Sequence, residues 1–256
     1  DIAVSDEALD EPEKRKFSIS IEFARKQWLP FIVITVSSVI YSFALDEDWG
    51  AVEKVLKDLK VNSTAIDEFR GCIDLLRVDS RVEAFNKAVR GDSSDEIRSE
   101  AWQFFIEKID AQAKSLRRSL GGLYQPIFQR FGDNIRCAGS IASSAIEPKN
   151  LFSLMRRVRF LIVASEAAQR LAKKRGTRVV IDAIRNPLEL VYLRDHFAGL
   201  YVIAITVDDD ERRSRLTELG LNKREIDKTD EKEYGAKKHL ADYTAFVSQN
   251  IRDCIQ

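Results

Sequence analysis

The stretch that most constrains this chain runs from Arg178 to Leu216 and reads RVVIDAIRNPLELVYLRDHFAGLYVIAITVDDDERRSRL. An apolar run ends at Asp182, a helical pattern follows, and a second apolar run extends from Leu200 to Val207. A strand, a helix and a strand within about forty residues form a βαβ unit, whose two strands lie parallel in one sheet. Ligands bind beyond the carboxyl ends of such strands, so we expect a site near Asp182.

Patterns elsewhere in the chain predict further strands and many helices. The alternation of apolar and polar residues at 17–23 and the β-branched run from Phe31 to Val36 are both typical of strands. Helical patterns occupy residues 49–59, 65–120 in pieces, 152–172 and 243–255, and a loop with a short helix is expected at 124–140. We expect one α/β domain over residues 17–256 with a helical insertion at about 65–120, after a polar, mobile tail at 1–16.

The charge balance and the cysteines limit the classes of partner. The chain has 41 basic and 41 acidic residues and a net charge of zero, whereas general binders of nucleic acid or anionic membranes are basic. The three cysteines form no C-x-x-C pair, which favours a reducing, cytoplasmic setting over a disulfide framework or a zinc ribbon. The longest apolar stretch, Leu29 to Leu45, is interrupted by serines, so we expect no membrane span.

Asp182 and Arg185 form the first candidate site. A carboxylate at a strand end can hold Mg²⁺ directly or through water, and an arginine three residues later can hold a phosphate in a bidentate fork. Asn186 and Pro187 are typical of a helix start, and Glu189 in the first turn can pair with Arg185. The alternative is an acid that caps a turn beside a surface arginine.

Further candidates for phosphate binding lie outside this strand end. Arg212, Arg213 and Arg215 follow a run of acids, and they fit either a lid over nucleotide phosphates or a solvated helix with internal ion pairs. Arg136 in the segment GDNIR is a third candidate, with a surface helix arginine as the alternative. Ser37 follows the strand at 31–36, where its hydroxyl can meet a ligand or cap a helix.

Several catalytic motifs are absent from these residues. The sequence contains no G-x-x-x-x-G-K-[ST] phosphate loop and no G-x-S-x-G elbow. It also lacks the H-x-E and P-C-x-x-C of a zinc deaminase, so we expect no zinc in this chain.

Four segments in fixed order carry a family resemblance. They are GDNIR at 132–136, the stretch at 179–216, the charged segment DEKEY at 230–234 and FVSQNIRDCI at 246–255. This series resembles the N-terminal P-loop kinase-like domain of the deoxycytidylate deaminases that act in bacterial defence against phage. It is more distantly similar to deoxynucleoside monophosphate kinases.

The resemblance implies a three-layer P-loop kinase-like fold with a mostly parallel sheet, and a domain that binds or senses nucleotides. It implies that Asp182 takes the Walker-B-like place and holds Mg²⁺ indirectly, that Arg185 contacts a monophosphate, and that Arg212 and Arg215 belong to the lid. ATP or a deoxynucleotide is the implied ligand, and a homo-oligomer or a deaminase domain is the implied partner.

Three functions follow as alternatives. The first is a nucleotide-binding regulatory domain of an antiphage protein, acting without phosphoryl transfer. The second is an active deoxynucleoside monophosphate kinase that uses ATP and Mg²⁺, for which the missing phosphate loop is an obstacle. The third is a degenerate kinase fold that supports oligomers or a partner.

Overall fold

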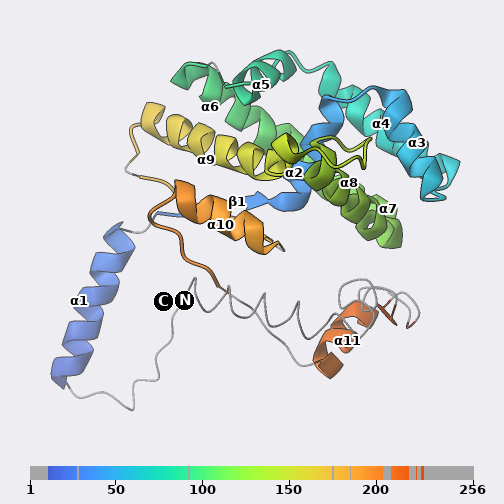
Figure 1. Cartoon of the computed structure of the whole chain (residues 1–256). Helices are drawn as coiled ribbons and strands as arrows, with labels where there is room; N and C mark the ends of the chain where they lie inside the picture. Colours follow the sequence, from blue (N-terminus) through green and yellow to red (C-terminus); the bar gives the residue numbers. More distant parts are fainter. Residues whose placement is uncertain are drawn as a thin grey trace.

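Helices make up most of the described chain in the computed structural model (Figure 1). The structure describes residues 11–27, 29–91, 93–174, 176–184, 186–203, 209–218, 223 and 226–227. The α-helices are α1 (Glu11–Gln27), α2 (Val36–Ser42), α3 (Trp49–Asp58), α4 (Ser63–Arg77), α5 (Val82–Val89), α6 (Asp95–Phe104), α7 (Ala111–Leu120), α8 (Tyr124–Ala138), α9 (Ser153–Leu171), α10 (Pro187–His196) and α11 (Asp209–Glu218). The shorter turns are η1 (Phe43–Leu45), the π-helix η2 (Phe105–Asp110), η3 (Gly121–Leu123) and η4 (Pro148–Asn150), and the strands are β1 (Phe31–Thr35) and β2 (Arg178–Asp182).

The two strands pair in parallel, although they lie far apart in the sequence. Phe31 is the register partner of Arg178, and Thr35 is the register partner of Asp182. One face of this sheet, with Ile34 fully buried, packs against the helices. The carboxyl ends of both strands therefore meet at one edge, where α2 begins directly after β1.

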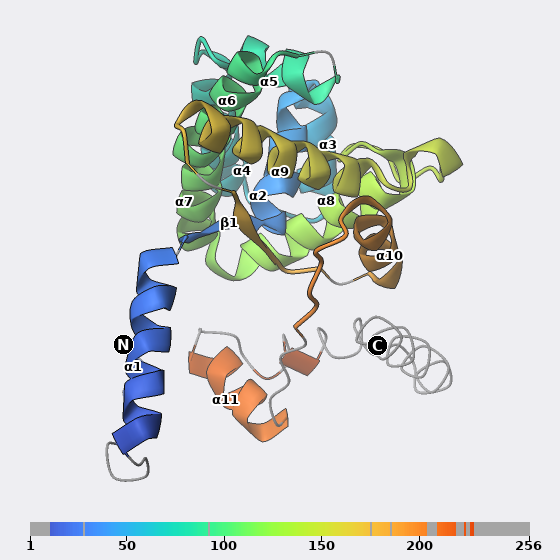
Figure 2. The same ribbon diagram turned by 90° about the vertical axis from the view of Figure 1, so that its left-hand side faces the viewer.

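The hydrophobic core lies among the helices rather than between layers of a sheet. Helix α9 packs along α6, and α2 runs through the centre of the bundle, where it contacts α8 and α9 (Figure 2). Aromatic rings fill this centre: Tyr41 on α2 meets Phe69 on α4 edge to face, with 5.7 Å between ring centroids, and Phe69 meets Phe131 on α8 at 5.9 Å. Apolar side chains at helical spacing, such as Val52, Val55 and Leu56 on α3, explain why these segments fold as amphipathic helices.

The expected three-layer α/β fold with a mostly parallel sheet is wrong. The structure is mostly helical and contains two short parallel strands in its described residues. Residues 17–23, expected as a strand, lie within α1, and Leu200 to Ile203 pair with neither strand. A strand needs a neighbour for its backbone hydrogen bonds, whereas a helix satisfies its own, so an alternating pattern without a sheet edge beside it can fold as a helix.

Two helices, α1 and α11, stand apart from the bundle. Figures 1 and 2 both show α1 projecting from the start of β1, and both show α11 separated from the bundle. Helix α1 begins at Glu11, inside the segment expected as a tail, and the helix expected at 243–255 lies outside the described residues. None of the helices in the described part is both long enough and apolar enough to span a bilayer.

Candidate functional site

The carboxyl edge of the sheet holds several of the candidate residues. Asp182 is exposed at the end of β2, beside its register partner Thr35 on β1. Asn186 caps α10, since its side-chain oxygen accepts a hydrogen bond of 2.9 Å from the backbone N–H of Leu188. Arg185 lies outside the described residues, so its expected pairing and its phosphate contact stay predictions.

Glu189 pairs with Arg136, and this contact brings together two candidates that are 53 positions apart in the sequence. The Nε of Arg136 donates to Oε1 of Glu189 at 2.7 Å, and Glu189 is only 4% exposed. The guanidinium of Arg136 lies against Gly132, one turn earlier on α8, where an added Cβ would come within 2.9 Å of Nη1. A glycine at this position therefore gives the arginine room to lie along α8 and reach α10.

The two ends of this ion pair differ in exposure. The side chain of Arg136 is 24% exposed, and Asp133 lies 4.0 Å from its Nη1, at the limit of an ion pair. The second carboxylate oxygen of Glu189, Oε2, is buried and accepts no hydrogen bond from the described residues. A buried carboxylate oxygen without a donor is costly, so this site favours an additional donor beside Glu189.

A second polar group surrounds the start of α2. The hydroxyl of Ser38 donates to Oδ1 of Asp110 at 2.7 Å, and Nζ of Lys114 lies 2.6 Å from Oδ2 of the same carboxylate. Ser37, the candidate from the sequence, lies on α2 directly before Ser38, and its side chain offsets part of the shift in the pKa of Tyr124. Burial raises the pKa of Tyr124, so this phenol stays protonated at neutral pH.

The sequence patterns did not reveal Asp110, Lys114 or Tyr124 as members of a polar group. Asp110 ends the π-helix η2, a form that departs from the α-helical period and often occurs at functional sites. The spacing of apolar residues around it indicates only a continuous helix, because a π-turn leaves no clear signature in such a pattern. The signal in the sequence was an acid directly after the apolar residue Ile109, and the structure shows that this acid is buried.

The three expected lid arginines lie on α11 and not at the carboxyl edge. Arg213 forms an ion pair with Asp227 at 3.2 Å, and Arg215 pairs with Glu211 one turn earlier on α11. Arg212 lies on the same helix, which both views show apart from β1 and α10. The ion pairs agree with the solvated-helix alternative, and closure of α11 over a ligand stays a prediction.

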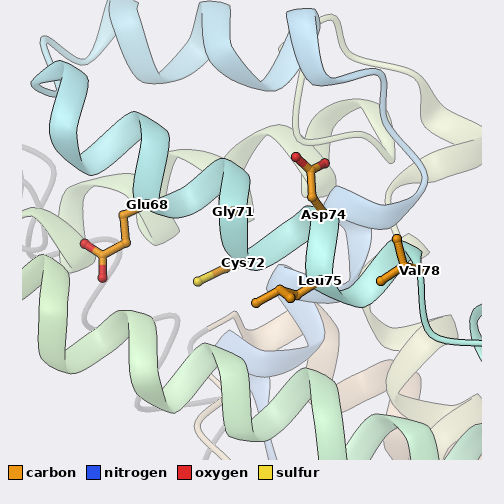
Figure 3. Close-up of a pocket in the computed structure, with 6 residues that line it drawn as sticks. All are labelled: Glu68, Gly71, Cys72, Asp74, Leu75 and Val78. Atoms are coloured by element: carbon orange, nitrogen blue, oxygen red, sulfur yellow. The ribbon is translucent and has the colours of Figure 1, made fainter.

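Neither an open depression on α4 nor a cluster of metal-ligating side chains gives a second site among the described residues. A shallow, open depression on the outer side of α4 is shown in Figure 3 and is lined by Glu68, Gly71, Cys72, Asp74, Leu75 and Val78. Burial raises the pKa of the Cys72 thiol, which disfavours the reactive thiolate. Within the described ranges, no group of three or more histidine, cysteine or acidic side chains could hold a metal ion together, so the Mg²⁺ role of Asp182 stays a prediction.

Comparisons with known proteins identify no relative of this chain. No family model, curated protein or solved structure matches it.

Proposed function

We propose that this chain binds the phosphate group of a nucleotide at the carboxyl edge of its sheet, with Arg136 as the principal contact. The observation that carries the proposal is the Arg136–Glu189 pair, in which a buried acid holds the guanidinium at a fixed place. The resemblance of the segments around Arg136 and Glu189 to nucleotide-binding kinase-like domains supports the same ligand class.

The geometry of the guanidinium suits this role. Arginine presents its N–H groups as a planar fork that matches phosphate oxygens. Glu189 takes the Nε donor, so the Nη groups of Arg136 are the ones available for a bidentate contact with a ligand. Because a side chain held in one orientation loses little entropy when a ligand binds, a fixed arginine binds a phosphate more tightly than a free one.

The proposed function is binding of a nucleotide without transfer of its phosphate. Transfer of a γ-phosphate needs a cradle for the β- and γ-phosphates, and these residues contain no G-x-x-x-x-G-K-[ST] loop. We place the chain in the cytoplasm as a nucleotide sensor of the antiphage deaminase type. This placement is supported by the free thiols of Cys72 and Cys137.

Calorimetric titration of the full chain with dCMP, dCTP and ATP, each with and without Mg²⁺, tests the proposal. We expect Arg136→Ala to weaken binding by about tenfold or more, since a charge-assisted hydrogen bond contributes about 1.5–3 kcal/mol. Arg130→Ala is the matched control, because Arg130 is an exposed arginine on the same helix. Equal affinities of the wild type and Arg136→Ala for all three nucleotides would refute the assignment.

Two further variants distinguish the parts of the site. Asp133→Asn removes a carboxylate that competes for Nη1, so it should strengthen binding. Glu189→Gln keeps an oxygen that can accept from Arg136 but removes the charge that fixes the guanidinium, so it should weaken binding less than Arg136→Ala does. If Asp133→Asn weakens binding instead, Arg136 does not contact the phosphate through Nη1.

A further inference from the structure

Three aromatic rings stack on one another where α10 packs against the start of α9, and we call them the ring column. They are Phe152, Tyr192 and His196. The rings of Phe152 and Tyr192 stack with 5.2 Å between their centroids and an interplanar angle of 23°. On the other face of Tyr192, the ring of His196 stacks with a centroid distance of 4.2 Å and an angle of 25°. Phe152 and Tyr192 are half-buried and His196 is exposed, so the column runs outward from the bundle.

One face of α10 joins the ring column to the Arg136–Glu189 pair. Glu189, Tyr192 and His196 are spaced i, i+3 and i+7 along α10, which places all three on one face of the helix. The rise of an α-helix puts Tyr192 about 4.5 Å and His196 about 10.5 Å beyond Glu189 along the helix axis. Arg136 reaches Glu189 from α8. A fixed guanidinium and a stack of rings therefore follow each other along the same face.

Hydrogen bonds hold the ring column in place at both of its ends. The Nδ1 of His196 lies 2.7 Å from the backbone oxygen of Tyr192, one turn earlier on α10. A carbonyl oxygen only accepts, so Nδ1 donates and the imidazole is fixed over the tyrosine ring. The side-chain amide of Asn150 donates to the backbone oxygen of Ala138 at 2.7 Å, which ties the chain just before Phe152 to the end of α8. Rings that are already fixed lose little entropy when a ligand stacks on them.

We propose that the ring column binds the base of a nucleotide by stacking on His196, while Arg136 holds a phosphate of the same nucleotide. This base contact rests on the proposed function, because one ligand supplies both groups. Every nucleobase has a flat π-face, and histidine is among the side chains on which bases stack. Stacking of this kind does not depend on which base is present, so we expect the column to accept purines and pyrimidines alike.

Stabilisation of α10 is the other role that stacked rings can have. Tyr192 and His196 are one turn apart, and such pairs stabilise a helix only slightly. Rings that serve to fill a core are buried, whereas the last ring of this column is exposed. No other aromatic side chain of the described residues stacks on His196. An exposed ring at the end of a fixed stack, on the same helix face as Glu189, fits a ligand contact better than a core contact.

Calorimetric titration of the full chain with AMP and with ribose 5-phosphate tests the base contact, because the two ligands share a phosphate and a sugar and differ in the base. We expect His196→Ala to weaken AMP binding by about tenfold and to leave ribose 5-phosphate binding unchanged. His196→Phe keeps a flat ring and should stay within about threefold of the wild type. Val191→Ala is the control, since Val191 is exposed on the opposite face of α10. Circular dichroism confirms that each variant is folded.

The same titrations distinguish a failure of the base contact from a failure of the proposed function. Arg136→Ala should weaken the binding of both ligands, because both carry the phosphate. If His196→Ala binds AMP as tightly as the wild type, or if His196→Phe loses as much affinity as His196→Ala, the base contact is refuted and the phosphate contact can still stand. If Arg136→Ala changes neither affinity while His196→Ala still weakens AMP binding, the proposed phosphate site fails and the base contact remains.

Discussion

The buried arginine of α9 gives the sharpest test of how this helical bundle is stabilised. Arg157 is only 7% exposed; its Nη1 donates to Ser42 at 3.1 Å and its Nη2 to Asp46 at 2.5 Å. Its guanidinium carbon lies 3.7 Å from the centroid of the Phe43 ring, and its Nε has no hydrogen-bond partner among the described residues. Burial lowers the pKa of Arg157, and the charge of Asp46 opposes that shift.

These contacts set the loss of stability that we expect when Arg157 is replaced by alanine. Breaking a fully buried ion pair costs about 3–5 kcal/mol. Asp46 is 38% exposed, so water can solvate it once Arg157 is gone, and the cost should be smaller. We expect Arg157→Ala to lower the free energy of unfolding by about 2–3 kcal/mol, including the lost packing on Phe43. That change corresponds to a fall of about 4–12 °C in melting temperature for a chain of this size.

A second substitution of Arg157 separates the effect of its charge on stability from the effect of its side-chain volume. Arg157→Met keeps most of the side-chain volume, removes the unpaired Nε and avoids burying a charge, so it should change stability by less than about 1 kcal/mol. Thermal and urea unfolding followed by circular dichroism measure both variants, with Arg130→Ala as an exposed control expected to stay within about 0.5 kcal/mol of the wild type. If Arg157→Met loses as much stability as Arg157→Ala, the charged hydrogen bonds outweigh the desolvation cost and this reasoning is refuted.

Three further predictions concern stability. The hydrogen bond from Arg81 holds the pKa of Asp79 below its ordinary value of 3.8, so this carboxylate stabilises the fold above that pH and the contribution is lost as the pH falls through the lowered pKa. In Asp79→Asn the free energy of unfolding should therefore depend less on pH below about pH 4. An unchanged pH dependence would contradict the pairing of Asp79 with Arg81. Ser38→Ala leaves Oδ1 of Asp110 without its donor and should cost about 1–3 kcal/mol in urea unfolding, whereas no loss would show that water replaces the hydroxyl. Gly139 ends α8 with φ of +77°, and an added Cβ would lie 2.9 Å from a serine hydroxyl at the start of α9. Gly139→Ala should lower the melting temperature by several degrees, and a neutral result would mean that the end of α8 can relax.

Helices and strands whose pattern lies within a few neighbouring residues could be predicted from the sequence. The stripe of Val52, Val55 and Leu56 specified α3, and Asn186 followed by Pro187 specified the start of α10. Each of these patterns forms its hydrogen bonds within a few residues, so the local sequence is sufficient to determine the element. The strands at Phe31–Thr35 and Arg178–Asp182 were also recognisable from their β-branched runs.

The secondary structure and the ion pairs of other segments depended on neighbours that are distant in the sequence. The alternation at 17–23 is compatible with a strand, but α1 pairs with neither of the described strands and satisfies its own backbone hydrogen bonds as a helix. The pairing of Glu189 with Arg136 depends on how α8 and α10 pack, and on the room at Gly132. Local patterns were thus sufficient to predict most of the helices, the two strands of the described residues and the cap of α10. The pairing of the two described strands and the Arg136–Glu189 pair were visible only in the folded chain, because strand pairing and ion pairing join residues that no local pattern connects.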